Sequence, residues 1–301
     1  LARVAVQSLA VTIQDISNAV FSIEAAVTTP PPSSSYNISD FSMFATNSLY
    51  MRSVCKVHSG HLGVMNANIS PKLGDDLELM LADRCYVKDG VTLIANTVKI
   101  KTSTSVDAVI CNTLINNGTV RGTTLTNLTL PLSVTLPAFY NASPGSTNIT
   151  LARSETYYLA PGSYGNIKMD KYSTLIFTGG TYHINNLETV DKPKLYFQGA
   201  SSVLVKNRIY TGKDPIIAPE DGSGISARDI VFYVAGINGS SGALSANPKS
   251  VRIGDRSRLK VNIYSPNGTL HIKARGICEG AYIGKDVMID YYTEITKNSA
   301  F

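Results

Sequence analysis

Short apolar runs separated by turn residues cover most of the chain after about residue 38. Within residues 258–290, apolar positions alternate with polar ones, and each run ends at a glycine or at the turn Pro266-Asn267-Gly268. A period of two places alternate side chains in one core, and none of the runs is long enough for a helix. The pattern therefore predicts a chain of short β-strands.

Two pairs of these runs repeat at an offset of twenty residues. TLIFTGG at 174–180 matches KLYFQGA at 194–200, and LELML at 77–81 stands at the same offset from TVKIK at 97–101. Turns follow too closely for crossover helices, and a degenerate repeat of this length is typical of a β-solenoid. A β-sandwich is the alternative, because it also has short strands and frequent turns. We favour the solenoid, and expect residues 38–301 to form it.

Several motifs are similar to those of a known group of proteins. They include LAPGSYG at 159–165, GGTYH at 179–183 and GAYIGKDV at 280–287. They resemble prokaryotic cell-surface proteins with a right-handed β-helical domain, related in style to the polymer-forming bactofilins and found in pilus-like surface proteins. The resemblance covers about residues 45–301. It implies a right-handed parallel β-helix and a location outside the cell, and it implies no reaction.

Residues 1–27 have a different pattern. Their apolar positions alternate at spacings of four and three, which places them on one stripe of a helix. The predicted assembly interface is Val6, Leu9, Ile13, Ile16, Val20 and Ile23. Burial of this stripe within the chain remains an alternative, as does a strand donated to a neighbouring subunit, since β-branched residues disfavour helix. Residues 28–37 contain three consecutive prolines and predict an extended linker.

Composition narrows the classes of function. The chain has 27 basic and 22 acidic residues, a net charge of +5 and no Lys/Arg run, which argues against a nucleic-acid partner. Charged residues make up 16% of the chain, which is typical of secreted β-rich proteins. The first residue is Leu, and no long apolar run follows, so we expect a chain whose signal or membrane anchor is removed or absent.

The cysteines and the Asn-X-Ser/Thr sites are also consistent with a location outside the cell. Four cysteines without CxxC spacing predict at least one disulfide, with buried free thiols as the alternative; they are Cys55, Cys85, Cys111 and Cys278. The candidate glycosylation sites are Asn37, Asn68, Asn117, Asn127, Asn148, Asn238 and Asn267. An eighth motif, at Asn141, is weakened by the nearby Pro144.

Catalytic chemistry is poorly represented. Cys55, His58 and His61 have metal-ligand spacing but no apparent fourth ligand. The adjacent acidic pairs, 75–76 and 220–221, can converge only in loops, where Asp and Glu are also ordinary turn residues. We therefore predict no enzyme, no cofactor and no metal.

Two classes of function remain. The first is a structural subunit of an extracellular filament, pilus-like fibre or surface layer, which forms a homopolymer through its N-terminal segment. The second is a polysaccharide-binding or polysaccharide-cleaving β-helix, or a minor tip adhesin. A loop crossing the outside of the solenoid, or joining two stacks of coils, is expected at 130–150, where three prolines interrupt the pattern.

Overall fold

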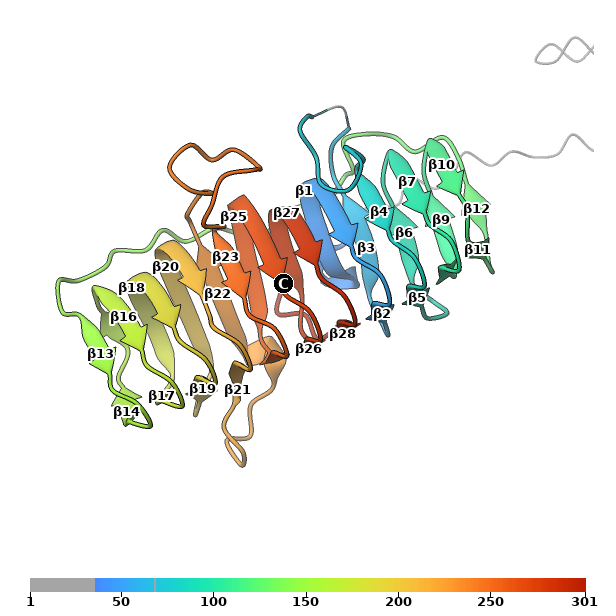
Figure 1. Ribbon diagram of the computed structural model, residues 1–301. Coiled ribbons are helices and arrows are strands. Elements are labelled where there is room, and N and C mark those ends of the chain that lie inside the picture. The colour runs from blue at the N-terminus through green and yellow to red at the C-terminus, as the bar shows by residue number, and fades with distance from the viewer. Residues whose placement is uncertain (1–35, 68) are drawn as a thin grey trace, which may run out of the picture. The chain divides into compact units, whose positions relative to one another are not determined.

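The computed structural model describes residues 36–67 and 69–301. These residues contain twenty-eight β-strands, two short 3-10 helices, η1 (Ile38–Asp40) and η2 (Ala227–Asp229), and no α-helix. Every strand pair is parallel, and the strands stack into one long solenoid (Figure 1). The predicted right-handed parallel β-solenoid is confirmed for this part of the chain. The proposed boundaries at 27 and 37 stay predictions, because most of that segment lies outside the described residues.

Eleven strands form one sheet, which we call face 1. Their order along the stack is β14 (Thr156–Leu159), β17 (Thr174–Phe177), β19 (Lys194–Phe197), β21 (Ile216–Pro219), β24 (Arg258–Lys260), β26 (Ile277–Glu279), β28 (Glu294–Thr296), β2 (Lys56–Val57), β5 (Tyr86–Val87), β8 (Ser105–Val106) and β11 (Thr119–Val120).

Seventeen strands form the second sheet. The first half of the chain contributes β1 (Phe41–Met51), β3 (His61–Val64), β4 (Leu79–Leu81), β6 (Thr92–Ile94), β7 (Thr97–Ile100), β9 (Ala108–Ile110), β10 (Thr113–Asn116) and β12 (Thr124–Leu125). The second half contributes β13 (Ile149–Leu151), β15 (Gly162–Ser163), β16 (Asn166–Met169), β18 (Gly180–Thr189), β20 (Ser201–Tyr210), β22 (Ile230–Val234), β23 (Val251–Ile253), β25 (Asn262–Ile272) and β27 (Tyr282–Ile289).

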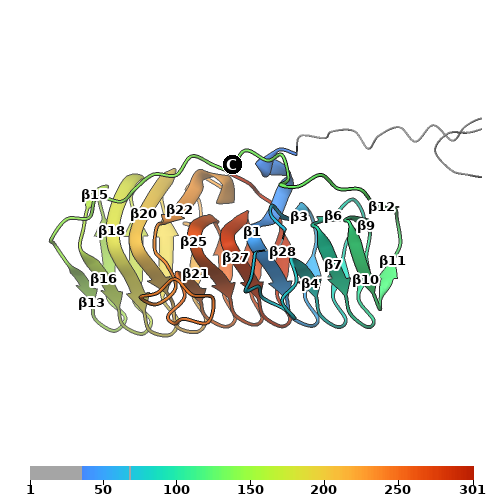
Figure 2. The same ribbon diagram turned by 90° about the horizontal axis from the view of Figure 1, so that it is seen from above.

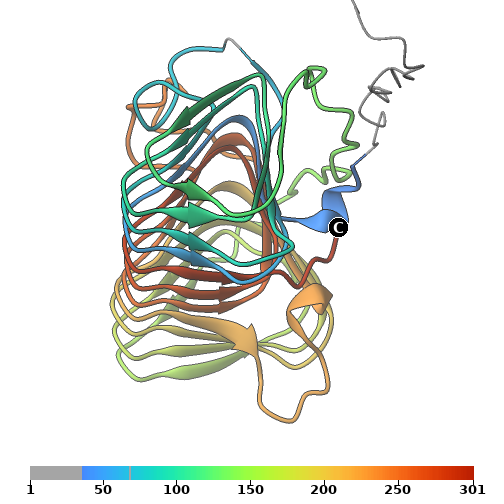
Figure 3. The same ribbon diagram turned by 90° about the vertical axis from the view of Figure 1, so that its right-hand side faces the viewer.

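The long strands of this sheet bend, so that the sheet covers two sides of the coil. The first part of β1 pairs with β3 and its last part pairs with β4, and β18, β25 and β27 show similar register shifts along their lengths. We call the side that contains β3, β22 and the first part of β1 face 2, and the side that contains β4, β23 and the last part of β1 face 3. Viewed from the end, the coils superpose around a common interior (Figure 3).

The first and last strands of the described chain meet in the middle of the stack. β1 lies between β27 and β3, and β2 lies between β28 and β5. From this seam the first half of the chain winds outward to β12. The chain then crosses back to β13 at the opposite end and winds inward to β28, so red strands lie beside blue ones in Figure 1.

A strap of residues 126–148 makes this crossing along face 2 (Figure 2). Its apolar side chains cover an apolar column that includes Phe44, Ile94 and Ile283. Leu132 is 4% exposed, and its backbone amide donates a hydrogen bond to the carbonyl of Met65 at 3.0 Å. The predicted crossing segment at 130–150 is therefore confirmed, and it both runs over the outside and joins two stacks.

The core is a column of apolar side chains that point into the coil. On face 1 the inward position is occupied by Leu175, Leu195, Ile217, Leu259, Cys278, Ile295, Val57 and Val87, each in register with the next. All eight are buried, because the period of two turns every second side chain of a strand into the same interior. A coil repeat of about twenty residues supplies one such residue per strand.

Candidate binding face

Face 1 presents ranks of outward side chains at regular spacing. The first rank is Thr156, Thr174, Lys194, Ile216, Arg258, Ile277, Glu294, Lys56, Tyr86, Ser105 and Thr119, an unbroken series of register partners. A second rank, two positions later, includes Tyr158, Ile176, Tyr196 and Ala218. Neighbouring strands lie about 4.8 Å apart, so each rank repeats at that spacing.

Charge divides this face into two parts. On β14, β17, β19 and β21 the eight outward residues of the two ranks include one charged residue, Lys194. We call this part the charge-poor end. From β24 onward the ranks contain charges of both signs, among them Arg258, Lys260 and Glu279. The face is thus a regular array in which one end is nearly uncharged.

A second regular feature borders face 1. At the turn between faces 3 and 1, one residue of nearly every coil has a left-handed backbone, with φ between 56° and 66°. These residues are Ser154, Tyr172, Lys192, Asp214, Arg256, Arg275, Tyr292, Val54, Arg84 and Ser103. None is glycine, although this conformation costs about 1 kcal/mol or more for other residues. We call this column the turn ridge, and most of its members are polar or charged side chains at the surface.

The turn ridge was not predicted from the sequence because its members differ in residue type. Val, Tyr, Lys and Arg are not ordinary signals of a left-handed turn, which favours Gly, Asn and Asp. The available signal was position: aligning the twenty-residue repeats would have brought Lys192, Arg256 and Arg275 into one column. The same alignment shows that basic residues scattered along the sequence gather in space.

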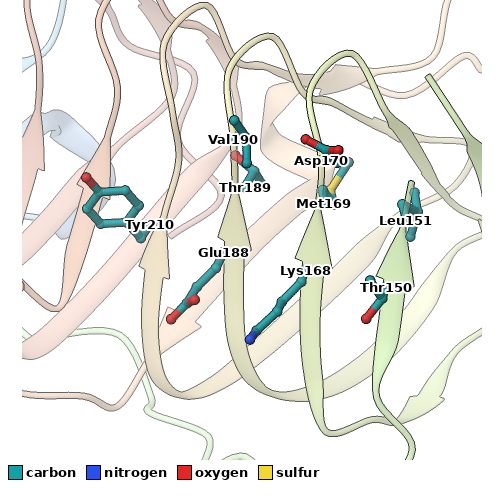
Figure 4. A pocket seen from close by; sticks show the side chains of 9 residues that line it. All are labelled: Thr150, Leu151, Lys168, Met169, Asp170, Glu188, Thr189, Val190 and Tyr210. Atoms are coloured by element: carbon teal, nitrogen blue, oxygen red, sulfur yellow. The ribbon is translucent and has the colours of Figure 1, made fainter. Parts of the chain in front are cut away.

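One concave feature near these elements is a hollow on face 3. Its volume is about 390 Å³, and Figure 4 shows its lining of nine side chains, including Lys168, Asp170, Glu188 and Tyr210. Lys168 and Glu188 lie on adjacent strands and in register. No histidine, cysteine or serine lines this hollow.

The acidic pairs considered from sequence stabilise loops. Lys99 lies 2.8 Å from Asp75, and this contact lowers the pKa of the Asp75 carboxyl. Asp76 accepts hydrogen bonds from Ser70 and from the backbone amide of Lys72. Glu220 accepts one from Gln198. These carboxylates therefore stabilise their own loops, as expected for ordinary turn residues.

The three residues with metal-ligand spacing point to different partners. The Cys55 thiol donates to the carbonyl of Asp290 at 3.1 Å, and His58 contacts Glu294 at 3.1 Å. His61 Nδ1 accepts a hydrogen bond from the backbone amide of Thr92. Across residues 36–67 and 69–301, no group of three or more potential ligands has metal-binding geometry.

All four cysteines are free and buried, so the predicted disulfide is absent from this structure. Cys85 and Cys55 occupy equivalent turn positions on adjacent coils, whereas Cys111 follows β9 and Cys278 lies in β26. The Cys85 thiol donates to the carbonyl of Arg52 at 3.2 Å, one coil away. Thr104 and Thr293 make the same contact on flanking coils. The two thiols therefore continue a ladder of side-chain donors, which explains them without a disulfide.

The candidate glycosylation sites differ in accessibility. Exposed positions are Asn37, Asn117, Asn127, Asn148 and Asn267. Asn238 is 1% exposed, and its side-chain nitrogen donates to Thr269 at 2.8 Å, so the prediction of a glycan there is wrong for the folded chain. Position 68 and the predicted assembly interface, residues 6–23, lie outside the described residues and stay predictions.

Within the described chain, no helix is long and apolar enough to cross a membrane. No family model matches the sequence, and no curated protein matches it.

Solved structures do align with the chain. An ice-binding protein from an Antarctic biological consortium is 12% identical, with a TM-score of 0.37 over 93% of this chain and 96% of the other. The DUF3494 domain of Shewanella frigidimarina ice-binding protein 1 is 13% identical, with a TM-score of 0.37 over 86% and 95%. An ice-binding protein from the Antarctic ascomycete Antarctomyces psychrotrophicus is 13% identical, with a TM-score of 0.31 over 86% and 95%. Scores this low do not establish a shared fold, and the architecture described above rests on its own strand register.

The expectation of a filament, pilus-like or surface-layer subunit is contradicted, because these aligned structures are described as ice-binding proteins. The alternatives of a polysaccharide-directed β-helix and a tip adhesin are also set aside. The physical reason for the error is that strand alternation and turn spacing report stacked coils, an architecture that many functions share. Of the resemblance to surface proteins, only the β-helical part is supported.

Proposed function

We propose that this protein is a secreted, non-catalytic ice-binding protein that contacts ice through the charge-poor end of face 1. Ice is the ligand to test because the aligned solved structures are described as ice-binding proteins. The surface feature of this chain that supports ice binding is the unbroken rank of register partners across face 1.

A crystal surface repeats in two dimensions, and a ligand site that matches it must also repeat. Strand stacking provides one repeat of about 4.8 Å, and the two-residue period within each strand provides the other. Thr156 and Thr174 are neighbours in the first rank, and in the second rank Tyr158 and Tyr196 flank Ile176, which is 4% exposed. A cleft for a small molecule would not need this regularity.

The composition of the charge-poor end also suits ice. Ice has no net charge with which to neutralise an ammonium or carboxylate group, so a charged residue at the contact would lose hydration without a partner. Threonine and tyrosine combine apolar surface with a hydroxyl that can join a hydrogen-bonded water lattice. Tyr158 is 60% exposed, so its side chain is available to a large flat ligand.

The test is partition of the protein into slowly grown ice. The wild-type protein is expected to enrich in the ice fraction and to slow recrystallisation. Thr174→Lys places a charge in the first rank at the charge-poor end and is expected to abolish enrichment. Ser105→Lys, in the same rank at the opposite end, is the matched control and should behave as wild type. Exclusion of the wild-type protein from ice, or equal effects of the two variants, would overturn the proposal.

A further inference from the structure

A basic groove lies where the turn ridge meets face 1. Its volume is about 510 Å³, and two adjacent columns of side chains line it. The turn ridge supplies Lys192, Arg256 and Arg275, and the first rank of face 1 supplies Lys194 and Arg258. We propose that this groove binds a linear polyanion that carries phosphate or sulfate groups.

Most of these cations lack an acidic partner. Arg256 forms a two-point ion pair with Asp214, with Nε to Oδ1 at 2.5 Å and Nη2 to Oδ2 at 2.8 Å. In the part of the chain that the structure describes, the other four cations form no ion pair with a carboxylate. The lining therefore has five positive groups and one negative group, and the excess charge faces solvent.

Aromatic rings hold two of the cations without neutralising them. The Lys192 ammonium lies 5.2 Å from the centroid of the Tyr172 ring, and the Arg275 guanidinium lies 5.9 Å from that of Tyr292. Such contacts restrict the motion of the two side chains and leave their positive charge available to a ligand. The cations are thus partly oriented before a ligand arrives, which reduces the entropy lost on binding.

The cations around the groove lower the pKa of its one carboxyl group, Asp214. The hydrogen bonds from Arg256 lower the pKa of Asp214 most, and Lys192 and Lys213 lower it further. Two other carboxylates lie near: Asp191 accepts a hydrogen bond from the backbone of Lys213, and Asp255 lines a smaller hollow on the opposite side of the ridge. They reduce the positive field without entering the groove.

The arrangement of the cations favours a chain of anions over a single one. They occur on the coils of β19, β24 and β26, which span three strand steps, or about 14 Å. One phosphate or sulfate could contact cations of neighbouring coils, but it could not reach from the coil of β19 to that of β26. Ile216 and Ile277 lie between the charged positions in the first rank, so the floor of the groove is partly apolar and strengthens nearby charge interactions.

The experiment measures binding of inorganic polyphosphate and, in a separate arm, dextran sulfate at about 50 mM salt. The test variant is Lys192→Gln/Lys194→Gln/Arg258→Gln. The control, Lys168→Gln/Lys206→Gln/Lys285→Gln, removes the same charge away from the groove. The groove variant is expected to bind at least about tenfold more weakly, with a salt-dependence slope reduced by about 2, while the control stays near wild type.

Equal weakening of the two variants would overturn the proposal, because net charge alone would then explain binding. Failure of the wild-type protein to bind either polymer would also overturn it. A loss confined to one polymer would identify phosphate or sulfate as the group that is recognised. All six positions are at least partly exposed, and circular dichroism verifies that the variants fold. Lys194 belongs both to the groove and to the charge-poor end, so partition into ice is measured separately on the groove variant; loss of polyanion binding with ice enrichment retained separates the two proposals.

Discussion

Arg52 and Asp290 come from opposite ends of the described chain, yet Nε of Arg52 lies 3.3 Å from the Asp290 carboxylate. The same carboxylate contacts Nζ of Lys273 at 2.5 Å and Nε2 of His271 at 3.2 Å, and it is 2% exposed. Lys56 and His58 contact Glu294 across the same seam. Carboxylates of the last coil therefore meet basic groups of the first, and these contacts join the two halves of the solenoid.

We expect Asp290→Asn to destabilise the protein by about 3 kcal/mol, because it leaves buried or half-buried cations without their counter-ion. Urea unfolding followed by circular dichroism measures this as a lower midpoint at an unchanged slope. Asp255→Asn serves as the control, because no side-chain hydrogen bond or ion pair is formed by Asp255 in the described chain; its effect should stay within about 0.5 kcal/mol. Equal midpoints for the two variants would show that the seam does not depend on Asp290.

The contribution of the Asp290 carboxylate should also make the free energy of unfolding depend on pH. Burial raises the pKa of Asp290, but contacts with His271 and Lys273 outweigh it and hold the pKa at about 2. Because this is below the value of about 3.9 for an unfolded aspartate, the stabilisation is complete above pH 4 and is lost as the pH falls towards 2. The stability difference between wild type and Asp290→Asn should shrink over that interval. A constant difference would contradict the assignment.

Asp286, which lies in β27 four residues before Asp290, should respond in the opposite direction. It is 1% exposed and accepts hydrogen bonds from Asn47 at 2.7 Å and Ser48 at 2.5 Å, both to Oδ1. Burial raises its pKa, so the charged form costs stability at neutral pH. Asn keeps the accepting oxygen and removes that cost. We expect Asp286→Asn to be neutral or stabilising by about 1 kcal/mol at pH 7 in the same unfolding assay; a loss as large as that of Asp290→Asn would refute this.

The ladder of side-chain donors formed by Cys55, Cys85, Thr104 and Thr293 leads to a prediction about the cysteines. Cys85→Thr should change stability by less than about 1 kcal/mol, because Thr104 and Thr293 already donate to a carbonyl one coil away at the equivalent position. Cys85→Leu should cost about 2 kcal/mol, since it removes the donor and overfills the corner. Thermal or urea unfolding compares the two.

Thiol counting checks the redox state of the same residues. Burial raises the pKa of Cys278 to about 12, and a contact with Cys85 together with burial raises the pKa of Cys55, so these thiols are protonated and slow to react in the folded protein. We expect four reactive thiols after denaturation without reductant. A count of two would show that two of the four cysteines form a disulfide, as the sequence analysis predicts.

Local pattern was enough to predict the coils. The offset between 174–177 and 194–197 is the observed register, in which Thr174 pairs with Lys194. For the earlier pair of segments the observed offset is one residue shorter, because Leu79 pairs with Val98. Alternation fixes which side chains point inward, whereas turn length sets the register, so an error of one residue arises where the turns differ.

The seam and the candidate site could not be predicted from the hydrophobic pattern of individual segments. Nothing in the sequence of β1 distinguishes β27 as its neighbour from any other strand of the stack, because each offers the same backbone pairing. The charge-poor end and the basic groove arise from residues one coil apart, so they appear only once the register is known. The strap was recognised as a crossing segment, but its prolines concealed the alternation of Leu128, Leu130 and Leu132 that packs it on face 2.

That alternation supplies a last test. Leu132 lies over the apolar column of face 2 and is 4% exposed, whereas Ser133, the next residue, is exposed. We expect Leu132→Ala to destabilise the protein by about 2 to 3 kcal/mol, through lost burial and the cavity left behind, and Ser133→Ala to have almost no effect. Urea unfolding measures both. Because the strap covers both halves of the solenoid, the loss should lower one cooperative transition. An early separate transition, with the main midpoint unchanged, would mean that the strap is only loosely attached and that the coils hold together without it.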